Sequence, residues 1–369
     1  MISAAAQHRW SRRTFLLGTA AVAGTLSTAG LAGCSAPGGP TAPGAPGSPT
    51  AGAGPSATGG ATPGPGQPSV SVFPGSVAGA ALEDRLAAYA TTLLSVGHDD
   101  LGRSGRRLVT SIRNQHLAHA AVLRSSDPTD PNSAGPGATT TAPSATPRPS
   151  AKAPSFAKAV DQLVAAESRA AVAHRAAALT GGGTTALLWG SLATSATQLR
   201  SVLLDADLGG DTPAPTVATV AAPRPRAPMP ALPVVQAEQQ VVAQLHAIVY
   251  GYQLALGRLT GSRRDIAAAE LRRHRILRDR LTARLLNRKA DVPVADAAYV
   301  PSTNPRNAAT AAKLVRQMET ALLPFGGLWL AAATTPAERS EAQDQLNRTS
   351  GVARRWGAAV SAWPGWKPA

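Results

Sequence analysis

Apolar residues recur at intervals of three and four along eight stretches of the chain, the spacing that places them on one face of an α-helix. Val242, Leu245 and Val249 illustrate this spacing. Alternating runs of Val, Ile and Tyr between turn residues, which would indicate strands, are almost absent. The pattern therefore predicts an all-α chain with helices over residues 77–96, 103–124, 155–179, 185–204, 234–259, 262–287, 307–334 and 336–363.

Stretches rich in Pro, Gly, Ala, Ser and Thr divide these helices into two sets of four. Such stretches bury too little apolar surface to offset chain entropy, so we expect them to be disordered. They separate two tandem four-helix bundles, at residues 77–210 and 234–364, each large enough to bury its own core. The disordered stretches are a tether at 34–76, an insert at 125–154 within the first bundle and a linker at 211–233.

The first 33 residues have the pattern of a bacterial export signal. Arg12 and Arg13 stand before a hydroxyl residue and Phe-Leu, as in twin-arginine signals, and an apolar run over residues 15–32 follows. Glycines interrupt this run, so it is weakly apolar for a membrane-spanning helix of about 20 residues. It ends in Leu-Ala-Gly-Cys, which resembles the lipobox at which a lipoprotein precursor is cut and its cysteine, here Cys34, is acylated. We therefore expect a lipid anchor on Cys34 that holds the mature chain on the extracytoplasmic face of the cell membrane.

The chain is basic and contains one cysteine. Lys and Arg number 36 against 21 Asp and Glu, which gives a formal net charge of +15 at pH 7. An anionic membrane face or an acidic wall polymer attracts such a protein over long range, although an Arg-rich and Ala-rich composition is equally typical of a high-GC genome. The exported location argues against nucleic acid as a partner. A single cysteine excludes disulfides within the chain, so burial of apolar surface must stabilise the folded part.

Several short motifs resemble an actinobacterial ferritin-like family of unknown function. They are the run from Leu245 to Tyr252, the pairs His274-Arg275 and Arg278-Asp279, and Glu319. The resemblance covers residues 234–364. The first half is similar to a more diverged relative, chiefly through residues 115–119 and Glu167. The resemblance implies a ferritin-like bundle in each half and does not imply an established activity. In the second half, residues 289–305 are long enough for the crossover connection of such a bundle.

The ferritin-like resemblance raises the question of a di-iron or di-manganese site, which takes carboxylates and two Glu-x-x-His pairs from four helices. In the second bundle the candidate ligands are Glu238, His246, Glu270, His274 and Glu319. The last predicted helix offers no Glu-x-x-His pair, and Glu270 and His274 are four residues apart instead of three. A complete dinuclear centre is therefore not expected. The favoured alternative is that these carboxylates pair with the arginines that crowd the sixth predicted helix.

Four residues of the first bundle form a second candidate set. His116 and His119 stand three residues apart on one predicted helix, and Glu167 and His174 stand seven apart on another. These spacings put each pair on one face of its helix, so all four could face a common space. Two histidines and a carboxylate can hold a single zinc or iron ion. The alternative is that the four are ordinary core or surface residues.

Motifs for other chemistry are missing from the sequence. The run of glycines at 181–183 lacks the Lys-Ser/Thr of a phosphate-binding loop, and no Gly-x-Ser-x-Gly elbow is present. The favoured function is therefore a non-catalytic, membrane-anchored binding or scaffold module of the cell envelope, whose partner is an envelope protein or an anionic wall polymer. The alternative is a ferritin-like metal-binding protein or oxidase with an incomplete or mononuclear site for iron, manganese or zinc.

Overall fold

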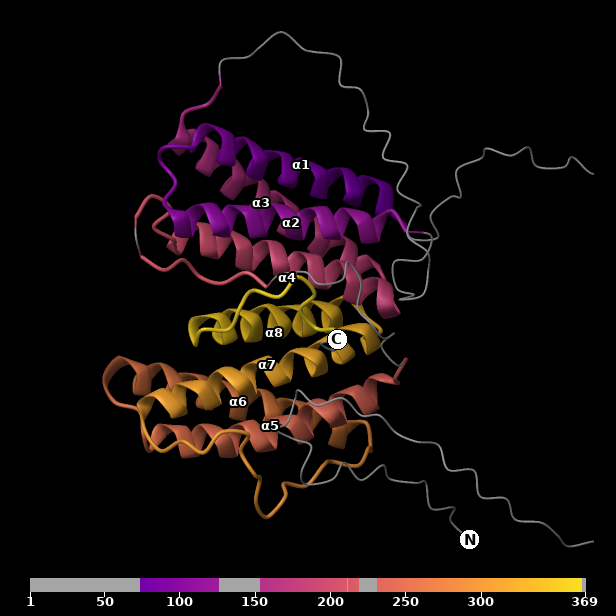
Figure 1. Cartoon of the computed structure of the whole chain (residues 1–369). Coiled ribbons are helices and arrows are strands. Elements are labelled where there is room, and N and C mark those ends of the chain that lie inside the picture. The colour runs from indigo at the N-terminus through magenta and orange to yellow at the C-terminus, as the bar shows by residue number, and fades with distance from the viewer. Residues whose placement is uncertain (1–73, 126–152, 211, 219–230, 367–369) are drawn as a thin grey trace, which may run out of the picture. The chain divides into compact units, whose positions relative to one another are not determined.

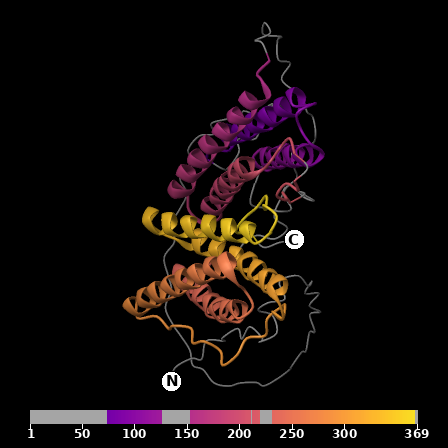
Figure 2. The ribbon, with the colours of Figure 1, turned by 90° about the vertical axis from the view of Figure 1, so that its left-hand side faces the viewer.

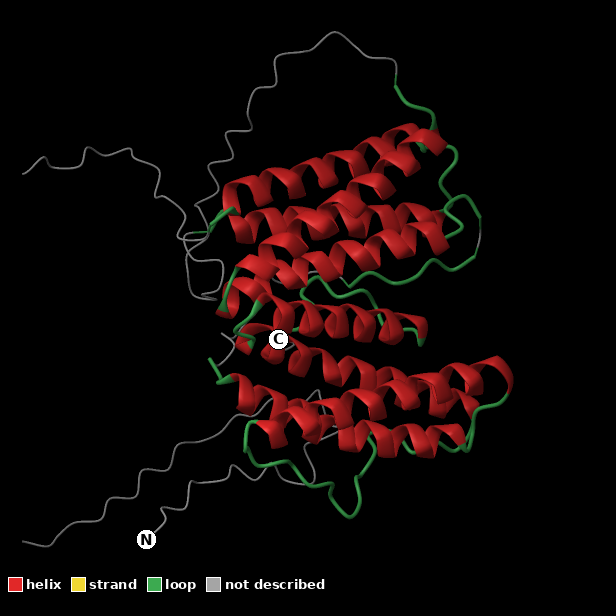
Figure 3. Cartoon of the chain, turned by 180° about the vertical axis from the view of Figure 1, so that it is seen from behind, coloured by secondary structure: helices red, strands yellow, loops and turns green. Residues whose placement is uncertain are grey.

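A computed structural model describes residues 74–125, 153–210, 212–218 and 231–366, and all statements on structure refer to these. They form eight helices and no strand (Figure 3), which confirms the predicted all-α fold. The helices are α1 (Ser76–Val96), α2 (Arg103–Leu123), α3 (Phe156–Thr180), α4 (Gly183–Asp205), α5 (Val234–Leu256), α6 (Gly261–Asn287), α7 (Ala308–Ala332) and α8 (Pro336–Arg355).

Local sequence signals fix where several helices begin. Asn307 caps α7 in a capping box with Thr310, and Thr335 does the same for α8 with Glu338. In each box the two side chains satisfy backbone N–H groups that the first helical turn leaves without a partner. Pro336 follows as the first residue of α8, where its missing N–H costs nothing. These boundaries therefore follow from short-range chemistry alone.

Each set of four helices has an apolar core. In the first set, α1 contacts α2 and α3, and α3 contacts α4; in the second, α5 contacts α6 and α7, and α7 contacts α8. The core of the first set includes Leu93, Ile112 and Leu163, and that of the second includes Leu245 and Trp329. The two cores account for the apolar periodicity of the sequence.

The two bundles also contact each other, through α4 on one side and α7 and α8 on the other (Figure 1). Figure 2 shows α8 in yellow between the helices of the first bundle and the orange helices of the second. Gln343 of α8 donates to the carbonyl of Gly190 at 3.0 Å and to the Thr194 hydroxyl at 2.9 Å, both on α4. The helices approach so closely that a Cβ at Gly190 would lie 2.2 Å from Gln343 Oε1. The bundles therefore share a packed boundary.

The last helix ends eight residues before its predicted end at 363. It stops at Arg355 because Gly357 adopts φ +89°, a left-handed conformation that favours glycine and ends helices. The segment 358–366, here called the C-terminal tail, then crosses to the first bundle. Val360 N–H donates to the Thr216 carbonyl at 2.9 Å, and the Val360 carbonyl accepts from Ala218 N–H at 2.8 Å. The expected helix over 336–363 is thus too long.

The residues of the predicted export signal and anchor, Arg12, Arg13 and Cys34, lie outside the described part of the chain. So do most of the predicted tether, insert and linker. None of the eight helices is long and apolar enough to cross a membrane.

Candidate metal centre in the N-terminal bundle

Glu83 is the centre of a buried polar cluster in the first bundle. Its Oε2 atom lies 2.8 Å from His116 Nδ1 and 3.0 Å from His119 Nδ1, and its Oε1 atom lies 2.7 Å from His174 Nε2. Glu167 joins through its Oε1 atom, 2.8 Å from His116 Nε2. All five side chains are at most 2% exposed. Two carboxylates and three imidazoles are therefore removed from water together.

Three helices position this cluster, which we call the His–Glu cluster. α1 supplies Glu83, α2 supplies the two histidines of the His-x-x-His pair, and α3 supplies Glu167 and His174. Spacings of three and seven residues keep each pair on the inward face of its helix. The buried polar side chains of the fourth helix, α4, are Ser191, Thr194, Ser195 and Gln198, none of which is a strong metal ligand. The cluster is therefore one-sided, with its strong ligands on three helices.

His116 and His119 present the same ring atom to Glu83. Nδ1 of each faces Glu83 Oε2, and Nε2 of each faces a fixed acceptor. For His116 that acceptor is Glu167, and for His119 it is the carbonyl oxygen of Ala362 in the C-terminal tail, at 2.8 Å. Histidines that bind metals are oriented in this way, with the second ring nitrogen donating to a carboxylate or carbonyl. The ligand atoms of Glu83, His116 and His119 all lie within 4.8 Å of one another, as a shared ion requires.

The metal-free cluster needs two more protons than its three neutral imidazoles carry. Each of its five contacts joins a ring nitrogen to a carboxylate or carbonyl oxygen, so each needs one hydrogen between the two atoms. Three neutral imidazoles carry three hydrogens. Without a metal, two more protons are needed, and they balance the charges of the two carboxylates. The metal-free cluster is then neutral overall and fully hydrogen-bonded at these contacts.

The pKa values of His116 and Glu83 place one of these two extra protons on His116. Burial lowers the pKa of His116, but the Glu167 carboxylate and hydrogen bonds to Glu167 and Glu83 outweigh it and raise that pKa to about 10. Burial raises the pKa of Glu83, yet the charge on His119 and three histidine hydrogen bonds hold it well below its usual value. For Glu167 burial prevails, and its pKa is raised. At neutral pH His116 is therefore an imidazolium beside an ionised Glu83.

Two tryptophans cover the cluster. The Trp363 ring, in the C-terminal tail, lies edge-on to His119 with centroids 4.7 Å apart. The Trp189 ring of α4 stacks on His174 at 5.5 Å. Both rings are large and apolar, so they exclude water and strengthen the electrostatic interactions inside.

Glu83 is the member of the cluster that the sequence pattern did not identify. The visible stripe on α1 runs through Leu82, but the structure leaves Leu82 half-buried and turns Glu83 inward with Leu86 and Ala90. The signal was present, since Glu83 lies three residues before Leu86 and seven before Ala90. A carboxylate on an apolar stripe identifies a buried polar site. The four residues predicted for this bundle are all brought together around it.

In the second bundle the predicted ligands are dispersed among different partners. Glu238 is fully buried and accepts from Arg284 Nη1 at 2.9 Å and Arg288 Nη1 at 2.7 Å. The same arginines bind Glu341 and Glu338 of α8, at 2.5 and 2.6 Å. Glu238 is thus neutralised by permanent cations of the protein and belongs to an ion-pair network between α5, α6 and α8.

The other four candidates of that bundle form two separate arrangements and one isolated contact. Tyr252 O–H donates to Glu319 Oε1, and His274 Nε2 lies 2.7 Å from the same oxygen. Glu270 pairs with Arg273 on its own helix. His246 is half-buried and donates from Nε2 to the Pro293 carbonyl at 3.2 Å. Within the described residues of this bundle, no three ligand atoms converge as those around Glu83 do.

Comparison with known families covers the second bundle and the tail. Residues 237–368 match a domain of unknown function, DUF4439. No curated protein and no solved structure matches the chain. The family model has no described activity, so the ferritin-like resemblance stays a prediction. The match extends to the tail, which means that the DUF4439 domain supplies the Ala362 carbonyl to a cluster in the other bundle.

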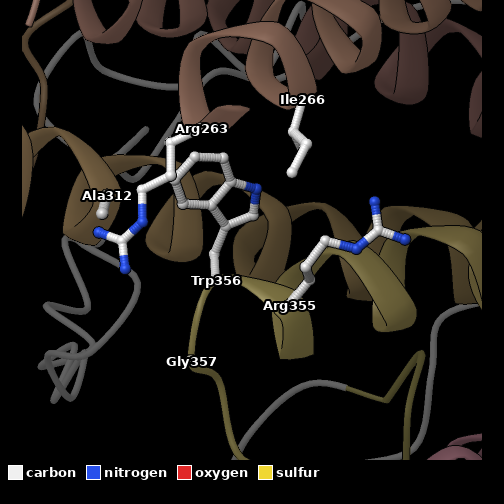
Figure 4. A pocket seen from close by; sticks show the side chains of 6 residues that line it. All are labelled: Arg263, Ile266, Ala312, Arg355, Trp356 and Gly357. Atoms are coloured by element: carbon white, nitrogen blue, oxygen red, sulfur yellow. The ribbon is translucent and has the colours of Figure 1, made fainter. Parts of the chain in front are cut away.

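The DUF4439 domain also has a surface hollow of about 290 Å³ at the end of its bundle (Figure 4). Arg263 and Ile266 of α6, Ala312 of α7 and the end of α8 line it. Figure 4 shows Arg263 and Arg355 on either side of the Trp356 indole. Both arginines are exposed, so water solvates their charge. None of the predicted ligands lines the hollow, and it stands apart from the His–Glu cluster.

Proposed function

We propose that the chain is a metal-binding protein that holds one divalent transition-metal ion on Glu83, His116 and His119. The observation that carries the proposal is the common orientation of the two histidines, each with Nδ1 toward Glu83 Oε2 and Nε2 toward a fixed acceptor. Two histidines and one carboxylate are a common ligand set for iron and zinc in proteins. His174 and Glu167 would hold the ligands in place through Glu83 Oε1 and His116 Nε2.

The donor atoms lie close enough together to bind one ion. Two atoms each about 2.1 Å from one ion lie about 3.0 Å apart at a right angle and about 3.4 Å apart at a tetrahedral angle. Glu83 Oε2 lies 2.8 and 3.0 Å from the two Nδ1 atoms. Both distances are close enough for a shared ion, and two histidines with one carboxylate are the ligand set of mononuclear iron sites, so Fe²⁺ and the similar Mn²⁺ are the ions to test. Such an ion supplies Lewis-acid or one-electron chemistry, and the burial of all five side chains of the His–Glu cluster favours retention of the ion over direct contact with a substrate.

Charge balance supports the same assignment. A divalent ion among Glu83 Oε2, His116 Nδ1 and His119 Nδ1 replaces the two hydrogens that occupy these contacts in the metal-free cluster. The net charge of the site is then the same with and without metal, and burial penalises neither state.

A metal titration tests the proposal. Metal-free mature protein should bind one Fe²⁺ or Mn²⁺ per chain and release about two protons per ion at pH 7, because both displaced hydrogens leave the site. Proton release can be measured with a pH indicator in weak buffer under anaerobic conditions. His116→Gln, which removes one ligand and keeps a hydrogen-bonding side chain, should bind none. Binding that persists in His116→Gln, or no binding by the unaltered protein, would refute the site.

We further propose that the protein works outside the cytoplasm, anchored by a lipid on Cys34 after twin-arginine export. The motifs around Arg12, Arg13 and Cys34 support this, and the route suits a protein that folds before it crosses the membrane. Binding of an envelope protein or an anionic wall polymer, favoured from the sequence, would then occur at the membrane surface. Metabolic labelling with a fatty-acid analogue should mark the unaltered chain and leave Cys34→Ser unlabelled and released from membranes. An unlabelled wild-type chain would count against the anchor.

A further inference from the structure

The C-terminal tail is bound to the first bundle at three places. Val360 forms a parallel bridge with Val217. Gln115 Nε2 of α2 donates to the Ser361 carbonyl at 3.1 Å, next to the contact of Ala362 with His119. Trp366 packs into an apolar cluster with residues of α4 and α7 and is almost fully buried. The tail therefore has a defined position over the His–Glu cluster.

The Ala362 contact fixes which way the His119 ring faces when a metal is bound. A carbonyl oxygen cannot donate, so Nε2 of His119 keeps its hydrogen for this contact, and a bound ion takes the place of the hydrogen on Nδ1. Nδ1 faces Glu83 Oε2, where the metal is assigned. Without the carbonyl, Nε2–H would lose its acceptor and the ring would be free to turn. His119 would then no longer hold Nδ1 toward the ion.

We propose that the C-terminal tail of the DUF4439 domain is a positioning segment of the metal site, in which the Ala362 carbonyl holds His119 Nε2 so that Nδ1 faces a divalent metal. This inference rests on the proposed function. It makes the site a composite of both halves of the chain. Because coupling between two equilibria is reciprocal, metal binding also stabilises the docked tail by the same factor.

Two neighbouring glycines of α7 provide a matched pair of variants. A Cβ at Gly327 would lie 1.9 Å from the Gly365 carbonyl oxygen and 2.6 Å from its carbon, which are backbone atoms, so the tail must move. A Cβ at Gly326 would lie 3.5 Å from a Leu346 methyl group, an ordinary contact. Both changes add one methyl group inside the same helix, and both alter helix propensity equally. Their difference therefore isolates the displacement of the tail.

Gly327→Ala should bind Fe²⁺ or Mn²⁺ at least about tenfold more weakly than the unaltered protein, and Gly326→Ala within about threefold of it. A chain that ends at Gly357, which lacks the tail altogether, should show the same loss as Gly327→Ala. In ¹⁵N spectra of protein loaded with Zn²⁺, which is diamagnetic, the His119 Nε2–H should be hydrogen-bonded in the unaltered protein and should lose that hydrogen bond in both altered chains. A tail that only stabilises the fold would not change that signal.

The outcomes separate the two proposals. If the unaltered protein binds no metal, the proposed function fails and the inference fails with it. If the unaltered protein binds one ion and the chain without its tail binds it equally well, the inference alone is overturned. If removal of the tail unfolds the protein, Gly327→Ala decides, with limited proteolysis of the tail to report its displacement. Equal metal affinity in a Gly327→Ala protein whose tail has become sensitive to protease is also contrary to the inference.

Discussion

Replacing Glu83 by alanine should lower the free energy of unfolding of the metal-free protein by about 3–5 kcal/mol and abolish metal binding. The carboxylate is the shared acceptor of three histidines and is 1% exposed, so its removal leaves buried donors and positive charge without a partner. Unfolding by denaturant, followed by helical circular dichroism, measures the loss of stability. A loss below about 1 kcal/mol would contradict the central place of Glu83.

Two further substitutions separate stability from metal binding. Glu83→Gln keeps the size of the side chain but carries no negative charge, so we expect a folded protein that binds no metal. Glu319→Gln is the matched change in the DUF4439 domain, where Glu319 is equally buried and accepts from Tyr252 and His274. It should reduce stability and leave the metal content at one ion per chain. Loss of metal in Glu319→Gln would indicate that the metal binds in the DUF4439 domain instead.

The metal-free protein should become less stable as the pH rises from about 6.5 to 10. The pKa of His116 is about 10 in the folded protein, and about 6.5 in an unfolded chain. Because the folded value is the higher one, the stabilisation is complete below pH 6.5 and is lost as the pH rises through 10. A tenfold difference in proton affinity between the folded and unfolded states corresponds to about 1.4 kcal/mol, so the expected loss is several kcal/mol.

At acidic pH the free energy of unfolding changes in the opposite direction and decreases as the pH falls. The pKa of Glu83 is held well below its usual value, so its stabilising effect is present above about pH 4.5 and is lost as the pH falls through the folded value. The titratable groups that face Glu83 and His116 are His119 on α2 and Glu167 and His174 on α3. Denaturant unfolding at intervals of half a pH unit measures both limits.

His116→Gln and metal loading are the controls for the alkaline limit. Glutamine does not titrate, so the loss of stability above pH 6.5 should be much reduced in that variant. With metal bound, the proton on His116 Nδ1 is already displaced, and the alkaline loss should be reduced in the same way. Equal alkaline loss in the unaltered, substituted and metal-loaded proteins would show that His116 is not the titrating group.

The sequence carries enough information for the helices and for four of the five residues of the His–Glu cluster. Apolar residues at spacings of three and four predicted eight helices, and the His-x-x-His pair with Glu167 and His174 identified four members of the cluster. The sequence pattern does not identify Glu83, because the apolar stripe passes through its neighbour Leu82. The hydrophobicity of a leucine on the edge of a helix face can mimic a core position, and only packing decides between them.

Other features depend on tertiary contacts that periodicity does not encode. Ala362 acts through its backbone carbonyl, which every residue has, so no side-chain pattern in the sequence identifies it. Its position follows from Gly357, which ends α8 early and frees the tail to cross to the first bundle. The arginines that crowd α6 predict that buried carboxylates pair with arginines, and Glu238 does pair with Arg284 and Arg288. Which carboxylate meets which arginine required the arrangement of α5, α6 and α8.

Anomalous diffraction from crystals of the protein loaded with Fe²⁺ or Mn²⁺ tests the central claim most directly. Data collected on both sides of the metal absorption edge locate the ion without reference to any assumed ligand. We expect a single peak about 2.1 Å from Glu83 Oε2, His116 Nδ1 and His119 Nδ1, beneath the C-terminal tail. A crystal of loaded protein with no peak there, or with its peak beside Glu319 and His274, would contradict it.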